Sequence, residues 1–112
     1  MIFITGPMFS GKKEYICRAL GWTAEDFEKN GVSRVEELAA KAEDIKVLAD
    51  ELCQKEVLIA SETGAGVVPV DKEQRTAREK AGRLACILAE RADTVIRVVC
   101  GIPQCLKGEL PA

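Results

Sequence analysis

Residues 6–13, Gly6-Pro-Met-Phe-Ser-Gly-Lys-Lys13, have the residue types and spacing of a phosphate-binding loop. They follow the apolar run Ile2-Phe3-Ile4-Thr5 and precede helix-forming residues, which is the context in which the pattern G-x-x-x-x-G-K holds phosphate. Gly6 and Gly11 let backbone N–H groups turn toward an anion, and Lys12 supplies positive charge. The pattern predicts a phosphorylated ligand, and its alternative is an ordinary glycine-rich turn between a strand and a helix.

The loop departs from the usual pattern at two positions. Ser or Thr normally follows the lysine and gives its hydroxyl to Mg²⁺, whereas Lys13 stands here. Pro7 also removes one backbone donor. We therefore expect weak nucleotide binding that does not depend on Mg²⁺, with Phe9, Ser10 and Lys13 among the residues of the loop that hold the nucleotide.

A second apolar run, residues 57–61, ends at an acidic residue, Glu62. Ligands of open α/β sheets bind at the carboxyl ends of the strands, so Glu62, Gly64 and Gly66 should face the same crevice as Lys12. A carboxylate at this place can hold Mg²⁺ or its water. Lys12 and Glu62 are therefore the candidate catalytic residues; a solvated carboxylate and plain turn glycines are the alternatives.

The order of apolar runs and helical patterns predicts an α/β fold. Continuous runs rich in β-branched residues, typical of buried parallel strands, occupy residues 2–5, 57–61 and 94–100. Helices are expected at residues 12–20, 23–30, 33–54 and 71–91. Residues 1–112 should form a single domain, a reduced P-loop NTPase-like (RecA-type) layered fold with a short parallel sheet flanked by helices.

Two of the expected helices carry further signals. The helix over residues 33–54 opens with a capping box, Ser33-Arg-Val-Glu36, and has one narrow apolar stripe formed by Val35, Leu38, Ala42, Ile45, Ala49 and Leu52. The stripe either packs on the sheet or forms a seam with a second subunit. In the last helix, Gly82 indicates the close approach of another backbone, because glycine otherwise weakens a helix.

Composition limits the classes of partner. The chain has 112 residues, 47% hydrophobic and 30% charged, with a net charge of −2, which argues against nucleic acid as the main partner. No apolar run reaches membrane-spanning length, so we expect a cytoplasmic protein that does not enter the membrane. Five cysteines, three of them on apolar helix faces, and no histidine give no expected metal-ligand set.

Four motifs in the second half of the chain occur in the same order as in a known protein family. They are Ser61-Glu-Thr-Gly-Ala-Gly-Val-Val-Pro69, Ala81-Gly-Arg-Leu84, Ala92-Asp-Thr-Val95 and Gly101-Ile-Pro-Gln-Cys-Leu-Lys107. Residues 57–107 thereby resemble the C-terminal half of the adenosylcobinamide kinase/adenosylcobinamide-phosphate guanylyltransferases of cobalamin biosynthesis. The resemblance implies a kinase and nucleotidyltransferase that uses GTP or ATP, a corrinoid substrate and a homo-oligomer.

The chain also departs from that family. The family has a longer first half with a histidine that becomes guanylylated, and this chain has no histidine. Phe9 stands where the family has a basic residue in the loop, and Lys13 replaces the Mg²⁺-binding hydroxyl. We therefore expect impaired or no guanylyltransferase activity. The alternatives are a non-catalytic scaffold (a pseudoenzyme or part of a split enzyme) and a thymidine-kinase-like nucleoside kinase, whose loops also read Gly-Pro-Met-Phe-Ser-Gly-Lys.

Overall fold

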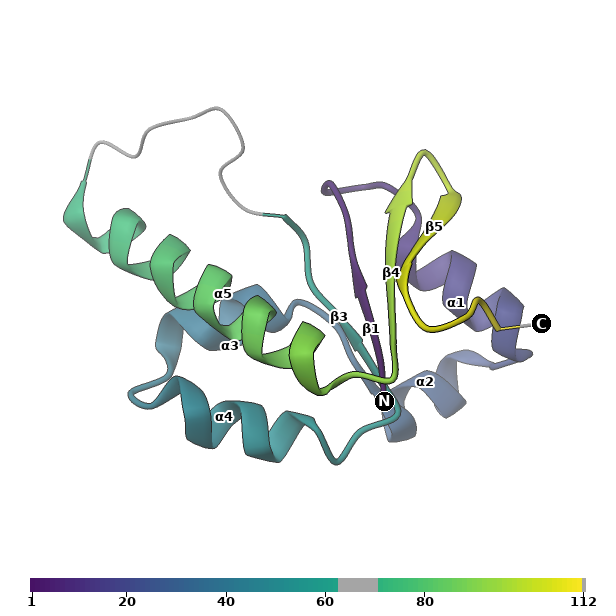
Figure 1. The fold of residues 1–112 in the computed structure, drawn as a ribbon, viewed down its shortest axis with the longest axis horizontal. Coiled ribbons are helices and arrows are strands. Elements are labelled where there is room, and N and C mark those ends of the chain that lie inside the picture. Colours follow the sequence, from purple (N-terminus) through teal and green to yellow (C-terminus); the bar gives the residue numbers. More distant parts are fainter. Residues whose placement is uncertain (63–70, 112) are drawn as a thin grey trace.

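The structure, a computed structural model, describes residues 1–62 and 71–111. Within these residues one sheet has the strand order β2-β3-β1-β4-β5 (Figure 1). Its strands are β1 (Ile2–Thr5), β2 (Gly31–Val32), β3 (Val57–Ile59), β4 (Thr94–Val99) and β5 (Ile102–Lys107). The first four are parallel, and β5 runs antiparallel to β4 at one edge. The mostly parallel sheet with flanking helices confirms the predicted α/β fold.

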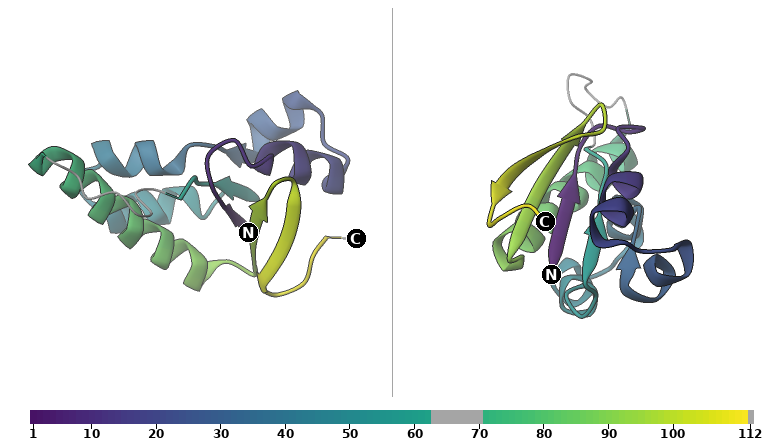
Figure 2. Two further views of the ribbon diagram at one scale, coloured as in Figure 1. Left: turned by 90° about the horizontal axis from the view of Figure 1, so that it is seen from above. Right: turned by 90° about the vertical axis from the view of Figure 1, so that its right-hand side faces the viewer.

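Helices cover both faces of the sheet, as Figure 2 shows. They are α1 (Lys12–Leu20), α2 (Ala24–Asn30), α3 (Val35–Lys41), α4 (Ile45–Leu52) and α5 (Lys72–Arg91). Neighbouring strand residues point to opposite faces, so Phe3 packs with α3, α4 and α5 while Ile4 packs with α1 and α2. Both side chains are almost fully buried, which explains why the strands read as continuous apolar runs.

The first two helices begin and end where local signals place them. Gly21 ends α1 in the left-handed conformation, with φ of 67°. Thr23 caps α2: its hydroxyl accepts a hydrogen bond from the Asp26 N–H, and the Asp26 carboxylate accepts one from the Thr23 N–H. These reciprocal bonds lower the pKa of the Asp26 carboxyl.

The single long helix predicted over residues 33–54 is wrong, because the chain breaks between α3 and α4. Ala42 is extended, with ψ of 139°, and Asp44 caps α4 by accepting from the N–H groups of Lys46 and Val47. Lys80 of α5 donates to the Ala42 carbonyl at 2.8 Å and so satisfies the end of α3. The predicted capping box at Ser33 is also absent, since the N-cap of α3 is Arg34.

The two helices turn their apolar residues into their own subunit. Val35, Ala39, Ala49 and Leu52 are buried in one cluster with Phe3. Leu38, which the predicted stripe included, is 40% exposed. Packing within the subunit is therefore the role the structure gives to most of the stripe.

A β-hairpin at the C-terminal side of the fold was not predicted. The expected strand over residues 94–100 ends at Val99, and Cys100 and Gly101 have φ of 52° and 75°. Two successive left-handed residues form the two-residue turn that suits hairpins, and they pair Val99 with Ile102. Pro103 lies within β5, which is tolerated because this strand is at the sheet edge.

The last helix matches its predicted bounds but not its predicted contacts. Asp71 caps α5 by accepting from the Gln74 N–H at 2.8 Å, and the buried face contains Ala81, Leu84 and Leu88. Gly82 is exposed, and a Cβ built there would meet no atom of the described residues within 4 Å, so none of the described backbone makes the predicted approach. Cys86, expected on an apolar face, is exposed. No helix in the described ranges is long and apolar enough to cross a membrane.

Candidate functional site

The loop of residues 6–13 leaves the carboxyl end of β1 and leads into α1. Gly6 has φ of 150°, and a Cβ at this position would overlap the carbonyl oxygen of Val98 on β4. Gly11 is left-handed with φ of 84° and serves as the N-cap of α1. At both positions a residue with a side chain would have a strained backbone. At Gly6 the loop backbone also passes close to the backbone of β4.

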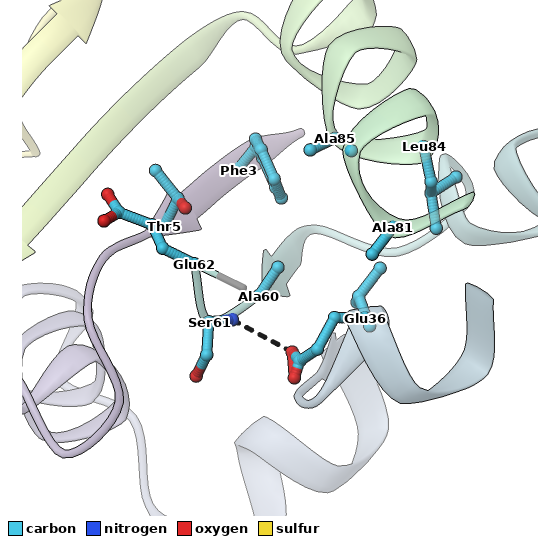
Figure 3. Close-up of a pocket in the computed structure, with 11 residues that line it drawn as sticks. Phe3, Thr5, Glu36, Ala60, Ser61, Glu62, Ala81, Leu84 and Ala85 are labelled. Carbon is cyan, nitrogen blue, oxygen red and sulfur yellow. Dashed lines mark hydrogen bonds between the residues drawn. The ribbon is translucent and has the colours of Figure 1, made fainter. Parts of the chain in front are cut away.

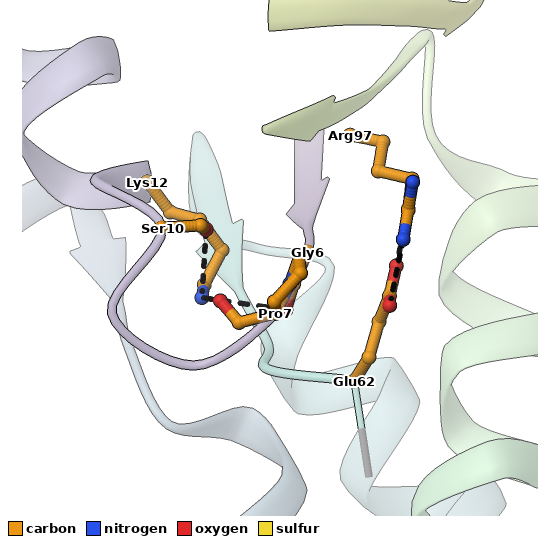
Figure 4. Close-up of polar contacts among 6 residues, drawn as sticks. All are labelled: Gly6, Pro7, Ser10, Lys12, Glu62 and Arg97. Atoms are coloured by element: carbon orange, nitrogen blue, oxygen red, sulfur yellow. Dashed lines mark hydrogen bonds and ion pairs between the residues drawn. The ribbon is translucent and has the colours of Figure 1, made fainter. Parts of the chain in front are cut away.

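Lys12, the residue on which the phosphate-loop prediction depends, is only 7% exposed and points into its own loop (Figure 4). Its Nζ donates to the Pro7 carbonyl at 2.7 Å and, at 3.4 Å each, to the Gly6 carbonyl and the Ser10 hydroxyl. Burial lowers the pKa of Lys12, and the carboxylates of Glu36, Glu62 and Glu14 partly oppose this. These loop oxygens are acceptors that a bound phosphate can replace.

Ser10 is also buried, and the β4–β5 hairpin holds it in place. The Gly101 N–H donates to the Ser10 carbonyl at 2.8 Å. The turn that sequence reasoning missed therefore supports the loop from the side.

Phe9 and Lys13 are both exposed. Phe9 is 97% exposed and has a left-handed backbone, with φ of 61°. The Lys13 ammonium lies 4.8 Å from the centre of the Phe27 ring on α2, a cation–π contact. Neither side chain offers the hydroxyl that binds Mg²⁺ in a typical phosphate loop.

Glu62 lies at the same edge of the sheet, where Arg97 of β4 engages both of its carboxylate oxygens (Figure 4). Nε of Arg97 bonds Oε1 at 2.5 Å and Nη2 bonds Oε2 at 3.0 Å. The hydrogen bond from Arg97 lowers the pKa of the Glu62 carboxyl. The Glu62 N–H donates to the Gly6 carbonyl at 2.8 Å, so the backbone of Glu62 lies against the start of the phosphate loop.

Sequence reasoning missed Arg97, although a signal existed. Arg97 is the one charged residue in the strand Thr94–Val99 and pairs in register with Thr5. A cation in a strand covered by helices needs a partner, and Glu62 was the carboxylate expected at that sheet edge.

Two hollows flank the end of β3, and Ser61 borders both. The first, of about 250 Å³, adjoins the phosphate loop and is lined by Lys12 and Lys13 together with Ser33 and Arg34 from the segment that precedes α3. It is the candidate phosphate site of this fold.

The second hollow, of about 220 Å³, lies between the sheet and helices α3 and α5 (Figure 3). Its interior is apolar, with Phe3, Ala60 and Leu84, and Glu36 stands at its edge. There the Glu36 carboxylate accepts from the Ser61 N–H at 2.9 Å, which fixes the chain just before Glu62.

Two other predicted site residues, Gly64 and Gly66, lie outside the described residues. In the parts of the chain that the structure describes, no three His, Cys, Asp or Glu side chains are grouped so that they could hold a metal ion.

The parallel sheet, the glycine turn at its carboxyl edge and the buried lysine place the chain among α/β folds of the P-loop NTPase type. The CobU family model, cobinamide kinase / cobinamide phosphate guanyltransferase, matches residues 18–106. The chain belongs to this family. The matched range begins after the phosphate loop, so the loop is supported by its own pattern and geometry.

One curated relative covers part of the same range. The "Bifunctional adenosylcobalamin biosynthesis protein CobP" of Pseudomonas aeruginosa is 42% identical over 59 residues, which are 53% of this chain and 34% of the relative. The match therefore spans about a third of that protein's length.

Proposed function

We propose that the chain binds the polyphosphate of GTP or ATP in the loop of residues 6–13. The observation that carries the proposal is the buried ammonium of Lys12, which is held by oxygens of its own loop at the carboxyl edge of a parallel sheet. A phosphate arriving there gains a charge-assisted contact that needs little reorganisation. Replacing Lys12 with Ala should abolish nucleotide binding, as measured by calorimetry on protein whose circular dichroism is unchanged.

Binding should be weak and independent of Mg²⁺. The position that supplies the metal-binding hydroxyl holds Lys13, whose ammonium lies over Phe27 and adds positive charge near the loop. A divalent cation would be repelled at this place, while a phosphate would not be.

Guanylyltransferase chemistry should be impaired or absent. The covalent step that the family resemblance implies requires a histidine nitrogen, and this chain has none. Both oxygens of Glu62 are engaged by Arg97, which supports a positioning role for Glu62 over metal binding. The same pairing favours the alternative function, a non-catalytic nucleotide-binding scaffold or part of a split enzyme.

A corrinoid is the second substrate that family membership suggests. The family's description names cobinamide and cobinamide phosphate. The apolar hollow beside Glu36 offers a place for an apolar group next to the phosphate site. Binding of cobinamide, followed by its visible absorption during equilibrium dialysis, tests this part of the proposal.

We also retain the proposal of a homo-oligomer. Ile102 on the edge strand β5 is 68% exposed and Leu106 is 55% exposed, which supports it. Ile45, by contrast, packs partly buried against the core of its own subunit. Light scattering at micromolar concentration decides the matter, and a clean monomer would reject an oligomer.

A further inference from the structure

Three residues other than glycine have positive φ in the described parts of the chain, and all three lie around the phosphate loop. Phe9 belongs to the loop, and Cys100 precedes the Gly101 N–H that holds Ser10. The third, Arg34, has φ of 56° and ψ of 41° and lines the hollow of the loop. Such backbone strain concentrates where ligands bind.

Within the described residues, the side chain of Arg34 makes no hydrogen bond or ion pair that would account for this conformation. Arg34 is the N-cap of α3, but its side chain makes no capping hydrogen bond. The residue is exposed. Across residues 1–62 and 71–111, no ion pair or side-chain hydrogen bond engages the Arg34 guanidinium. The strained backbone therefore holds an uncommitted cation beside the loop.

The charges of the hollow show what this cation could bind. Lys12 and Lys13 reach the hollow from the start of α1, and Arg34 reaches it from the segment before α3. Glu14 is the single carboxylate among the described residues that line it. The hollow therefore has an excess of positive charge, supplied by two segments of the chain. Such a site attracts a ligand with several negative charges more strongly than a ligand with only two negative charges.

We propose that Arg34 is a phosphate-binding residue that contacts the terminal phosphate of a nucleoside triphosphate. This inference rests on the proposed nucleotide binding in the loop. The loop N–H groups and Lys12 hold the inner phosphates, and Arg34 adds a planar fork of donors for the outermost one. The residue thereby gives the site a preference for triphosphates over diphosphates and monophosphates.

The test compares Arg34→Gly with the wild type by calorimetric titration of GTP, GDP and GMP. Glycine accepts positive φ without strain, so this variant should fold with an unchanged or raised melting temperature. Its affinity for GTP should fall about tenfold or more, because a hydrogen bond to a charged group is lost, while its affinity for GMP stays the same. Arg34→Lys, which keeps the charge but not the fork, should lose less.

Arg18→Ala is the matched control, because it removes the same charge from the exposed end of α1 away from the loop. It should bind all three nucleotides as the wild type does. If Arg34→Gly binds GTP as tightly as the wild type, or loses GTP, GDP and GMP equally, the assignment of Arg34 is wrong. If the wild type binds no nucleotide, the proposed function itself fails and Arg34 falls with it.

Discussion

The guanidinium of Arg97 on β4 donates two side-by-side hydrogen bonds to the carboxylate of Glu62, which lies just after β3. The pair bridges the two strands that flank β1, directly beside the point where the phosphate loop begins. It joins the end of β3 to the rest of the carboxyl edge, where the candidate site lies.

Replacing Glu62 with Gln should destabilise the protein at neutral pH by about 1 kcal/mol, since the pair is partly exposed. Because Arg97 lowers the pKa of Glu62 below 4.5, the stabilisation is present above pH 4.5 and is lost as the pH falls through the folded-state pKa. Urea unfolding at pH 7 and at successively lower pH should show the two proteins converge. A constant difference down to pH 3 would mean that the pair contributes nothing through charge.

Two glycines should respond to alanine in opposite ways. Gly82→Ala should stabilise the protein by about 0.5–1 kcal/mol, because Gly82 is exposed within α5 and has space for a methyl group. Gly6→Ala should cost about 2 kcal/mol or more, since its Cβ would overlap the Val98 carbonyl and its φ is positive. Thermal unfolding followed by circular dichroism measures the melting temperature of each variant, which should rise for Gly82→Ala and fall for Gly6→Ala. A Gly6→Ala variant as stable as the wild type would contradict the described path of the loop.

Lys12 should titrate below the usual lysine value of 10.5, because burial disfavours its charged form. Competitive labelling with trace acetic anhydride across pH 7–11, read by mass spectrometry, measures this pKa. Adding GTP should raise the apparent pKa and slow the labelling, since a phosphate stabilises the ammonium. Labelling of Lys12 that GTP leaves unchanged would place the nucleotide elsewhere.

Incubation with labelled GTP should leave no covalent guanylyl group on the protein, because the chain lacks histidine. Denaturing electrophoresis after the incubation is the measurement. A stable, stoichiometric label would restore a transferase function through another nucleophile.

The features that sequence alone predicted correctly depend on local chemistry. The helix α1 begins at Lys12, directly after the glycine-rich loop, and ends before Gly21, which adopts the left-handed conformation typical of a helix C-cap. The start of α2 follows from the reciprocal bonds of Thr23 and Asp26. Residues close in sequence decide these elements, so a single sequence suffices to find them.

The features that were missed depend on contacts between distant residues. The Glu62–Arg97 pair requires β3 and β4 to flank β1 in a particular register. The break before Asp44 was hidden because Ala42 and Ile45 continue the apolar spacing of one helix. The strand β5 contains Pro103, which a sheet tolerates at its edge, and that edge position follows only from the fold.

Arg34 was missed because its position follows from a backbone conformation. Its sequence neighbours suggested a capping box opening at Ser33, whereas the structure places Arg34 itself at the N-cap, in the left-handed region. Nothing in the spacing of charged residues brings Arg34 beside Lys12. Only the fold places both at one hollow.

The central claim, that the loop around Lys12 binds a nucleoside polyphosphate, is tested most directly by calorimetric titration of GTP and ATP into the wild type and Lys12→Ala. Each titration is run once with Mg²⁺ and once with EDTA. Lys46→Ala, which removes an exposed lysine of α4, is the control. We predict weak binding by the wild type and the control, equal with and without the metal, and none by Lys12→Ala. Equal binding by the wild type and Lys12→Ala, or no binding by the wild type, would contradict the claim.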